Sequence, residues 1–584
     1  MTKTITGGEV IAGMLAKEGV RKIFGIVDGT YLSLCVSLNR YGMDLVTPRH
    51  EATAAHMAGA YARMTGGLGV CIASNGPGVA NVLSGATVEN AEGNRVLVIT
   101  SSRRTGISYP DRGGAYQYFD QVAAMKPISK GSWSVSGFAR IQEIMRRAFR
   151  MSYRGRPGVV HVDVPEDVIN GKGRAEPLWE PRRYRKADRI APAADLVERA
   201  AGYLEEAELP LIHGGSGVIH SSAFDELAQL SDLLHAPVTT SWSGRGVFSE
   251  TSELSWPMVH VKACSELRKA ADVVLCLGSR LGETDWWGKP PYWAPAGEQT
   301  LIQVDVDEEI LGMNRPADLP VLADVKEFLG RLLEALAPRR AKMGLDARRE
   351  RVRRLAEAKV KNRTDLDKKL DDASVPMVTA HVGKVCSDVF QDDAIVVFDG
   401  GNTAVWGIFY YLIRAGGTQL GTHHFGMLGA GVGQALGAAV ARPEKQVFCI
   451  IGDGAFGFHP QEIETAVRHG LKAVFLVCCD RQWGMVKMNQ QFALKPLKTM
   501  IKKSLGPGET FYTDLGEIAF DKLAHAMGGH GERVADPAEL RPALERSLAS
   551  GKCAVIHVDV DPVKHMWAPG LIHFKKMHQE PGGK

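Results

Sequence analysis

Gln446-Val-Phe-Cys-Ile-Ile-Gly-Asp-Gly454 is the stretch of sequence that decides the fold. It begins with a short, β-rich and almost wholly apolar run, which predicts a strand buried in a parallel sheet. A second run of this kind, Ala473–Cys478, ends just before Asp480, and an amphipathic stretch, Pro460–His469, lies between the two runs. The sequence therefore predicts a strand–helix–strand unit with Asp453 and Asp480 at the carboxyl ends of its strands.

The two acidic residues suit a metal ion that holds phosphate groups. The carboxyl ends of parallel strands meet in one crevice, where open α/β sheets bind ligands. Mg2+ takes one or two carboxylates together with phosphate oxygens, and Gly452 and Gly454 let the backbone approach phosphates closely. The alternative is that Asp453 and Asp480 only cap turns at the strand ends. The strand–helix–strand frame favours the site for Mg2+ and a diphosphate.

Composition excludes several classes of protein. The chain has 584 residues, 45% of them hydrophobic, and a net charge of +4 that is too small and too evenly spread for a nucleic-acid-binding protein. Nine scattered cysteines without a spacing framework indicate reduced thiols. No apolar leader is visible and no apolar run is long enough to span a membrane, so we expect a cytoplasmic protein without membrane contact.

The length predicts three or four domains, and three blocks are visible. In each block, short β-rich runs alternate with helical stretches, which is typical of an α/β fold with a parallel sheet wrapped by helices. The blocks cover residues 1–185, 191–337 and 375–560, and a tail, 561–584, follows. A charged helical connector, 339–369, joins the second block to the third.

Gly452-Asp453-Gly454 followed by Cys479-Asp480 resembles the diphosphate-binding motif of thiamine diphosphate (ThDP) enzymes, which runs from Gly-Asp-Gly to a closing Asn-Asn. Here Cys479-Asp480 stands in place of the Asn pair, so Asp480 keeps an oxygen donor for the metal but adds a charge. The resemblance implies two sets of ligands: Asp453, Asp480 and the main-chain oxygen of Gln482 for Mg2+, and Gly452, Gly454 and Ala455 for the diphosphate.

The resemblance covers essentially the whole chain. The three blocks match the family order of pyrimidine-binding, central and diphosphate-binding domains, which implies three doubly wound parallel-sheet domains. The chain is most similar to the group that contains acetolactate synthase, benzaldehyde lyase and the 2-hydroxyacyl-CoA lyases with oxalyl-CoA decarboxylase. In this family the pyrimidine domain of one subunit faces the diphosphate domain of another. The resemblance therefore implies a homodimer or homotetramer with the active site shared between subunits.

Arg49-His50-Glu51 resembles the family motif whose glutamate activates the cofactor. Glu51 begins an apolar, Ala-rich helix, and the resemblance assigns its carboxyl group to N1′ of the pyrimidine. The alternative for this residue alone is a glutamate that only satisfies the helix dipole. The segment Gly114–Val122 resembles the one that bears an active-site Gln, and Gln117 falls on that position. A Gln in a surface loop is the alternative there.

Other segments resemble the parts of the family that hold ThDP. Asn402-Thr403 follows a predicted strand and matches the diphosphate anchors. The carbonyl of Gly426 would accept from the 4′-amine, and Leu428 would wedge between the two rings, because the bent cofactor is strained and needs packing. An ordinary core residue is the alternative for Leu428. The glycine turn Asn75-Gly76 would border the cofactor and the substrate entrance.

The resemblance assigns the substrate pocket to Asp28, Gly29, Thr30, Tyr116, Trp483 and Met485. Relatives specialised for decarboxylation have an acid at the Gly29 position, and benzaldehyde lyase has a His at the Thr30 position. Neither is present, and the paired histidines of pyruvate decarboxylase are missing near Tyr116, so plain decarboxylation with proton release is disfavoured. The aromatic and basic tail, Met566–Lys576, is either a lid over the site or a docked tail without function.

The central block resembles a nucleotide-binding domain. Gly278–Gly282 and Gln303–Asp307 resemble segments that hold FAD in acetolactate synthase or ADP in oxalyl-CoA decarboxylase. The Met-His-Gly loop that meets the flavin in acetolactate synthase is absent near Pro257–His260. FAD is therefore disfavoured, and an adenine nucleotide or an empty site remains open.

Together these residues predict an enzyme with a small-molecule substrate. The resemblance implies a ThDP- and Mg2+-dependent carbon–carbon bond lyase or carboligase, in class terms a lyase or transferase, that works through a C2 carbanion and an enamine. An acetolactate synthase-like reaction on 2-keto acids or 2-hydroxy ketones is the first prediction. A 2-hydroxyacyl-CoA lyase like oxalyl-CoA decarboxylase is the second, and a catalytically idle ThDP-fold binding protein is the alternative from another class.

Overall fold

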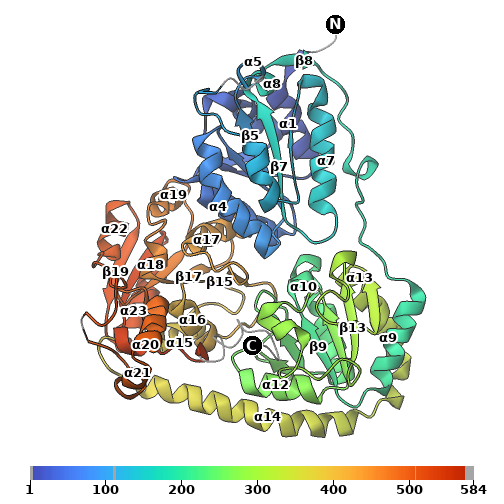
Figure 1. The fold of residues 1–584 in the computed structure, drawn as a ribbon, viewed down its shortest axis with the longest axis vertical. Helices are drawn as coiled ribbons and strands as arrows, with labels where there is room; N and C mark the ends of the chain where they lie inside the picture. Colours follow the sequence, from blue (N-terminus) through green and yellow to red (C-terminus); the bar gives the residue numbers. More distant parts are fainter. Residues whose placement is uncertain (1–3, 109–112, 507, 572–584) are drawn as a thin grey trace.

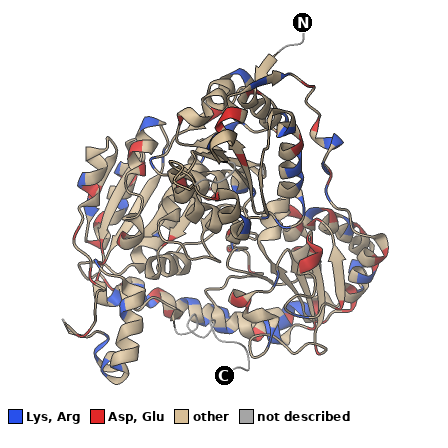
Figure 2. Ribbon diagram, turned by 45° about the horizontal axis from the view of Figure 1, so that its top comes forward, with Lys and Arg blue, Asp and Glu red and all other residues tan. Residues whose placement is uncertain are grey.

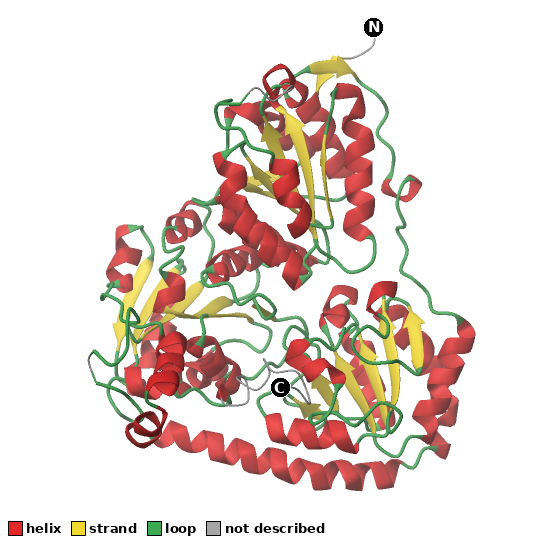
Figure 3. Cartoon of the chain, viewed as in Figure 1, coloured by secondary structure: helices red, strands yellow, loops and turns green. Residues whose placement is uncertain are grey.

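Three units of sheet and helix, each built around its own sheet, make up the molecule. The computed structural model describes residues 4–108, 113–506 and 508–571, and Figure 1 shows the units at the corners of a triangle. Each unit contains one six-stranded sheet, and all strand pairings within these three sheets are parallel. Helices cover the sheets on both faces (Figure 3). The predicted α/β class with three doubly wound parallel sheets is confirmed.

The first sheet has the strand order β3-β2-β4-β5-β7-β6. Its strands are β2 (Lys22–Gly25), β3 (Asp44–Val46), β4 (Gly69–Ala73), β5 (Val96–Ser102), β6 (Gly131–Ser134) and β7 (Val159–Pro165). Alternate residues of a strand point to opposite faces, so Val70 and Ile72 pack under α1 (Gly7–Lys17), α2 (Leu32–Leu38) and α7 (Ile141–Tyr153). Cys71 and Ala73 pack under α3 (Glu51–Thr65) and α4 (Pro77–Glu92).

The central sheet has the order β11-β10-β9-β12-β13-β14 around its own core. Its strands are β9 (Pro210–Gly214), β10 (Val238–Thr240), β11 (Ser255–Trp256), β12 (Val273–Leu277), β13 (Thr300–Asp305) and β14 (Leu319–Leu322). The main covering helices are α9 (Ala194–Glu206), α11 (Phe224–Leu234), α12 (Val261–Ala270) and α13 (Val325–Leu336).

The third sheet has the order β16-β15-β17-β18-β20-β19. Its strands are β15 (Ile395–Asp399), β16 (Gln419–Gly421), β17 (Val447–Gly452), β18 (Val474–Cys479), β19 (His530–Val534) and β20 (Ala554–Asp559). The predicted strand–helix–strand unit is present as β17, α19 (Glu462–Arg468) and β18. Four further helices matter for the site: α16 (Asn402–Tyr410), α17 (Ala430–Ala441), α20 (Gly484–Leu494) and α24 (Pro562–Met566).

The first and third units share one hydrophobic core, which α3 and α17 build between them. Helix α17 is rich in Gly and Ala, and this allows a very close approach of the two helices. A Cβ on Gly437 would lie 2.4 Å from the carbonyl oxygen of Met57, and one on Gly433 would lie 2.7 Å from Cβ of His56. The two units are therefore fixed to each other within one chain.

The charged connector is the long helix α14 (Leu345–Asp367), which runs along the bottom of Figure 1. Figure 2 shows that basic and acidic residues are interspersed along it and over the rest of the ribbon, in keeping with the small net charge. Within the described ranges, no helix is both long and apolar enough to cross a membrane. The domain boundaries that the sequence predicts remain predictions.

Candidate active site

Glu51 is the first residue of α3. The helix begins here because His50 is extended and caps it, with Nδ1 accepting a hydrogen bond from Ala52 N at 3.1 Å. The Glu51 side chain is buried, at 8% exposure, and its Oε2 accepts a hydrogen bond from Asn81 Nδ2 at 3.0 Å. Asn81 lies on the neighbouring α4, so two helices of the first unit orient this carboxyl group.

The predicted pocket loops of the first unit are joined by hydrogen bonds. Asp28 Oδ1 accepts from Thr30 N at 2.8 Å and caps the turn that follows it. Ser101 Oγ lies 2.6 Å from Thr30 Oγ1 and accepts from Asn75 N at 3.0 Å. Asn75 Nδ2 in turn donates to the carbonyl oxygen of Gln117 at 3.1 Å. The structure thus brings together the loops that follow β2, β4 and β5.

The loop with Tyr116 and Gln117 lies against the Asn75-Gly76 turn. Gly76 has a φ of +64°, and a Cβ there would be 2.6 Å from the Gln117 carbonyl oxygen, so glycine is needed on both counts. Gln117 itself has a φ of +55°. Both side chains are exposed, Tyr116 at 75%. The loop is therefore held by its backbone, and its side chains are free to contact a ligand or a second subunit.

In the third unit, Asp399 organises the turn that carries Leu428. Its Oδ2 accepts hydrogen bonds from Gly429 N at 3.0 Å and Gly431 N at 2.8 Å. Burial raises the pKa of Asp399 to about 6, and these N–H donors oppose that shift. Leu428 is half-buried against the core that the first and third units share, and Gly426 lies just before it with a φ of +68°.

Asp453 and Asp480 lie at the ends of β17 and β18, where the sequence predicts them. Burial, and then the charge of Asp480, raises the pKa of Asp453 to about 6, and burial raises the pKa of Asp480 to about 6. Asp453 Oδ2 accepts from Arg481 N at 2.8 Å, and Asp480 Oδ2 accepts from Gln482 Nε2 at 3.1 Å. A divalent cation would stabilise both carboxylates in their ionised form.

Asn402 lies at the start of α16, and its surroundings show whether a phosphate group fits beside these carboxylates. Its side chain is only 4% exposed, yet neither Oδ1 nor Nδ2 has a hydrogen-bond partner among the described residues. A Cβ on Gly484 would lie 2.8 Å from Asn402 Nδ2 and 3.0 Å from Asp480 Oδ2, so the glycine keeps the amide and the carboxylate accessible. An unpartnered buried amide is unfavourable unless a ligand satisfies it. The residues fit a phosphate held next to a cation.

His565 in α24 belongs to this group, although no sequence pattern singles it out. Its Nδ1 lies 2.6 Å from Thr379 Oγ1, its Nε2 lies 3.2 Å from Thr403 Oγ1, and Nε2 is 3.9 Å from Asp480 Oδ2. Burial lowers the pKa of His565 to about 4, so its ring is neutral at pH 7. It therefore orients Thr403 as an uncharged partner.

Trp483 and Met485 follow the two carboxylates and border the glycine turns. Trp483 packs so closely on the Gly-Asp-Gly turn that a Cβ on Gly454 would lie 2.7 Å from its ring. Met485 Cβ is 3.2 Å from the place where a Cβ on Gly401 would stand. A cavity of about 570 Å³ opens beside Asp453 and Trp483. Its further lining combines the apolar Phe458, Leu515, Ile518 and Phe520 with Arg481, Glu517 and His557.

The two groups of residues lie in different units of the chain. Glu51 and the pocket loops belong to the first sheet, whereas Asn402, Asp453 and Asp480 belong to the third. Among the described residues no hydrogen bond joins Glu51 to either aspartate. Within one chain the units meet elsewhere, chiefly through α3 and α17. The structure assembles each half of the predicted site separately.

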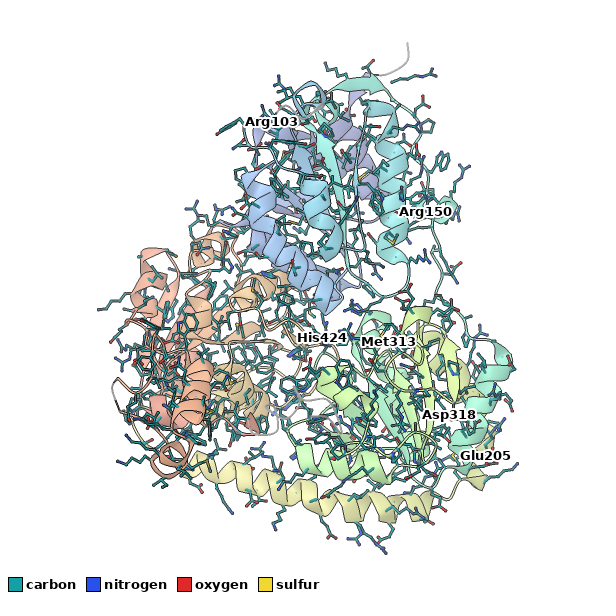
Figure 4. The ribbon with its side chains drawn as sticks, in the orientation of Figure 1. Arg103, Arg150, Glu205, Met313, Asp318 and His424 are labelled. Atoms are coloured by element: carbon teal, nitrogen blue, oxygen red, sulfur yellow. The ribbon has the colours of Figure 1, made fainter. Side chains whose placement is uncertain are left out.

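A further cavity, of about 420 Å³, lies between the first and central units and reaches His424 of the third, which Figure 4 labels where the three units meet. The predicted segments Gly278–Gly282 and Gln303–Asp307 both contribute to its wall. The backbone is tightly packed there, since Gly278 has a φ of +57° and accepts from Gly217 N at 3.1 Å. The basic residues of the wall are Arg95, Arg156, Arg185, Lys186, Arg189 and Arg280, and the acidic ones are Asp188, Asp285, Asp305 and Asp324.

The tail is described as far as Leu571. Trp567 Nε1 donates to the carbonyl oxygen of Lys503 at 2.7 Å, and its ring lies 5.7 Å from that of Phe492. This first part of the tail therefore docks on α20 and the helix after it. His573, Phe574, Lys575 and Lys576 lie outside the described residues, so the lid remains a prediction.

Three family models match the chain in succession. The thiamine pyrophosphate enzyme N-terminal TPP binding domain matches residues 5–124, the central domain matches 197–332, and the C-terminal TPP binding domain matches 399–558. Each match falls on one of the three sheets. The chain belongs to the thiamine pyrophosphate, or ThDP, enzyme family.

Relatives that align along the whole chain define the group within that family. The acetolactate synthase large subunit IlvG of Mycobacterium tuberculosis is 30% identical over 569 residues, which is 96% of this chain and 96% of the relative. The probable acetolactate synthase large subunit of Methanocaldococcus jannaschii is 29% identical over 574 residues, 96% of this chain and 92% of the relative. The 2-hydroxyacyl-CoA lyase of Arabidopsis thaliana is 29% identical over 568 residues, 96% of each chain. The protein is a ThDP-dependent enzyme of this group.

Proposed function

We propose that the protein is a Mg2+- and ThDP-dependent carbon–carbon bond lyase or carboligase that acts, like acetolactate synthase, on 2-keto acids or 2-hydroxy ketones. The observation that carries this proposal is the buried, unpartnered amide of Asn402 beside the carboxylates of Asp453 and Asp480. The absence of an acid at Gly29 and of a His at Thr30 disfavours plain decarboxylation. Similarity to acetolactate synthase large subunits supports the choice of substrate class.

When bound, ThDP supplies an electron sink beside the substrate carbonyl. The chain provides the groups that activate and orient it. The carboxyl group of Glu51 would form a hydrogen bond with the pyrimidine N1′, and Asn81 orients this carboxyl group. On the turn that Asp399 organises, the carbonyl of Gly426 would accept a hydrogen bond from the 4′-amine, and Leu428 would pack against the two rings of the cofactor.

The third unit anchors the phosphorylated end of the cofactor. Asp453, Asp480 and the main-chain oxygen of Gln482 would bind Mg2+. Asn402 and Thr403 would donate hydrogen bonds to the diphosphate, and Gly452, Gly454 and Ala455 would let it approach the backbone. Trp483 borders the largely apolar cavity and Met485 lies beside Gly401, where both would contact the substrate, while Asp28 and Gln117 offer polar contacts to it.

A 2-hydroxyacyl-CoA lyase is the second candidate, and the cavity between the first and central units favours it. The cavity is lined by several arginines and reaches His424, two residues before Gly426. Arginine binds phosphate groups well, and CoA carries several of them. The same lining suits an adenine nucleotide that takes no part in the reaction. FAD is not proposed, because the Met-His-Gly loop is absent.

We propose that the active site is shared between subunits of a homodimer or homotetramer. The placement of Glu51 in the first unit and of Asp453 and Asp480 in the third supports this, because the third unit of a partner can then complete the site that Glu51 serves. The other partner is the small-molecule substrate. All nine cysteines are free thiols, and the cytoplasmic location remains a prediction.

Exchange of the C2 proton of bound ThDP tests the assigned role of Glu51. Glu51→Gln should abolish exchange, measured by proton NMR after acid quench in D2O, while cofactor binding stays largely intact. Glu444→Gln, on the exposed surface, serves as the charge-matched control. Unchanged exchange in Glu51→Gln refutes the assignment. A panel of 2-keto acids and 2-hydroxyacyl-CoA thioesters then separates the two candidates, since cleavage of the thioesters alone favours the second.

A further inference from the structure

The chain segment that presents Glu51 is held by the third unit, through α19 and the residues beside it. Thr47 N donates to His469 Nε2 at 3.1 Å, and Arg468 Nη2 donates to the Thr47 carbonyl oxygen at 2.6 Å. The rings of His50 and His459 lie 5.4 Å apart. The turn from β3 into α3 thus rests on α19 and on residues just before and after this helix of the third unit.

Glu462 makes the central contact of this interface. Its side chain is fully buried, and its Oε1 and Oε2 lie 3.1 and 3.0 Å from the backbone N of Arg49, which donates to them. Thr465 Oγ1 donates to Glu462 Oε2 at 2.7 Å and orients the carboxylate. Burial raises the pKa of Glu462, and the backbone N–H groups of Arg49 and His50 oppose the shift. The carboxylate also faces the positive end of α3.

The neighbouring acidic residue of the same helix makes a weaker contact. Among the residues that the structure describes, Glu464 pairs only with side chains, that of Arg49 at 3.2 Å and that of Arg468 at 3.0 Å, and it is partly exposed. Exposed ion pairs of this kind contribute little, whereas a buried carboxylate that binds backbone N–H groups fixes the main chain. Glu462 is therefore the contact that determines where the backbone of residues 49 and 50 lies.

We propose that Glu462 is a positioning residue, which holds Arg49 and His50 so that Glu51 points correctly at the pyrimidine of ThDP. The proposal rests on the proposed function. Helix α19 also connects β17 to β18, whose ends bear Asp453 and Asp480. In an enzyme whose active sites are shared between subunits, the third unit therefore has two roles. It binds the metal of one active site and, through α19, positions Glu51 of another.

Glu462→Gln tests the proposal, because it keeps the size of the side chain but turns an amide N–H toward backbone donors. We expect C2 proton exchange per bound ThDP to slow about tenfold, which corresponds to about 1.4 kcal/mol. The ThDP affinity should change less than about threefold, since Asn402, Asp453 and Asp480 anchor the diphosphate. Glu464→Gln makes the same charge change two residues away and should leave exchange within about twofold of wild type.

Thr465→Val provides a milder variant in case Glu462→Gln does not fold. It removes only the hydroxyl that orients the Glu462 carboxylate, and exchange should slow about threefold. A lower melting temperature with exchange per bound ThDP unchanged in both variants would overturn the proposal, because Glu462 would then only join the domains. If exchange also survives in Glu51→Gln, the proposed function itself fails. If Glu51→Gln abolishes exchange while Glu462→Gln and Thr465→Val leave it unchanged, the proposed function stands and only the positioning role of Glu462 is refuted.

Discussion

Asn81 Nδ2 lies 3.0 Å from Glu51 Oε2, so the side chain at the start of α3 is oriented by a residue of α4. Gly78 of the same helix lies beside the other carboxyl oxygen, since a Cβ there would be 3.4 Å from Glu51 Oε1, close to ordinary van der Waals contact. The amide donates and the carboxyl oxygen accepts, so this hydrogen bond fixes the orientation of the Glu51 side chain. Asn81 is thus a positioning residue for the activating group of the proposed mechanism.

Asn81→Ala should slow C2 proton exchange of bound ThDP about tenfold. The variant removes a hydrogen bond to the Glu51 carboxyl group, an interaction of about 1.5 kcal/mol, without altering the residues proposed to bind the diphosphate. Exchange is measured by NMR after acid quench, and ThDP affinity by calorimetry. Asn81→Asp would slow exchange further, because it places a second carboxylate against Glu51. Wild-type exchange in both variants would remove Asn81 from the mechanism.

Asp480 should make the protein bind a divalent cation more tightly than an amide at that position would. The charge count of the ligands tunes metal affinity, and the Asn that is typical of the family is replaced here by a carboxylate. We expect Asp480→Asn to weaken Mn2+ binding about tenfold at pH 7.5 without ThDP, measured by electron paramagnetic resonance of free Mn2+. Equal affinities in the two proteins would show that the extra charge has no role.

Metal-free protein should lose stability as the pH rises from about 4 through about 6. The pKa of Asp453 and of Asp480 is raised from 3.8 to about 6 in the folded state, so the folded protein binds more protons than the unfolded chain in this window. The contribution of these two carboxyl groups to the free energy of unfolding is complete below pH 3.8 and is lost as the pH rises through about 6. Mg2+ with ThDP should oppose the loss, because the metal binds the ionised carboxylates.

Urea unfolding at pH 5 and pH 7 measures this effect, with EDTA in one series and Mg2+ with ThDP in the other. Asp480→Asn is the matched variant, since it removes one carboxylate of the pair and keeps its size. The change in unfolding free energy between the two pH values should be smaller in the metal-free variant than in the metal-free wild type. Identical changes would mean that other buried acids account for the pH dependence.

The cavity at His424 should bind ADP through its arginines. Arg156 comes from the first unit and Arg280 from the central unit, and both line the cavity. Arg156→Ala and Arg280→Ala should each weaken ADP binding about tenfold or more, as measured by calorimetry, because charged hydrogen bonds to phosphate are strong. Lys552→Ala, on the exposed surface, is the control. A wild-type protein that binds neither ADP nor CoA would leave this cavity without an assigned ligand.

Much of the fold follows from local sequence patterns. The apolar run before Gly452 and the run before Asp480 predict β17 and β18 because strands buried on both faces read as continuous apolar stretches. The same reasoning places Asp453 and Asp480 at neighbouring strand ends, where the structure has them. These inferences succeed because they need only the chain's own periodicity.

The rest of the site depends on contacts between distant parts of the chain. His565 reaches Thr403 across 162 residues, and the carboxylate of Glu462 reaches the backbone of Arg49 across 413. Neither residue stands in a motif, because each acts through tertiary packing alone. Asn81 and Asp399 do stand beside recognised motifs, but only the structure shows which atoms they bind.

Calorimetric titration of ThDP into the full-length protein tests the central claim most directly, with and without saturating Mg2+. We predict about one ThDP bound per chain in the presence of Mg2+ and binding at least tenfold weaker in EDTA, because the metal joins the diphosphate to Asp453 and Asp480. If the protein saturated with Mg2+ shows no affinity for ThDP, the assignment of these residues is wrong.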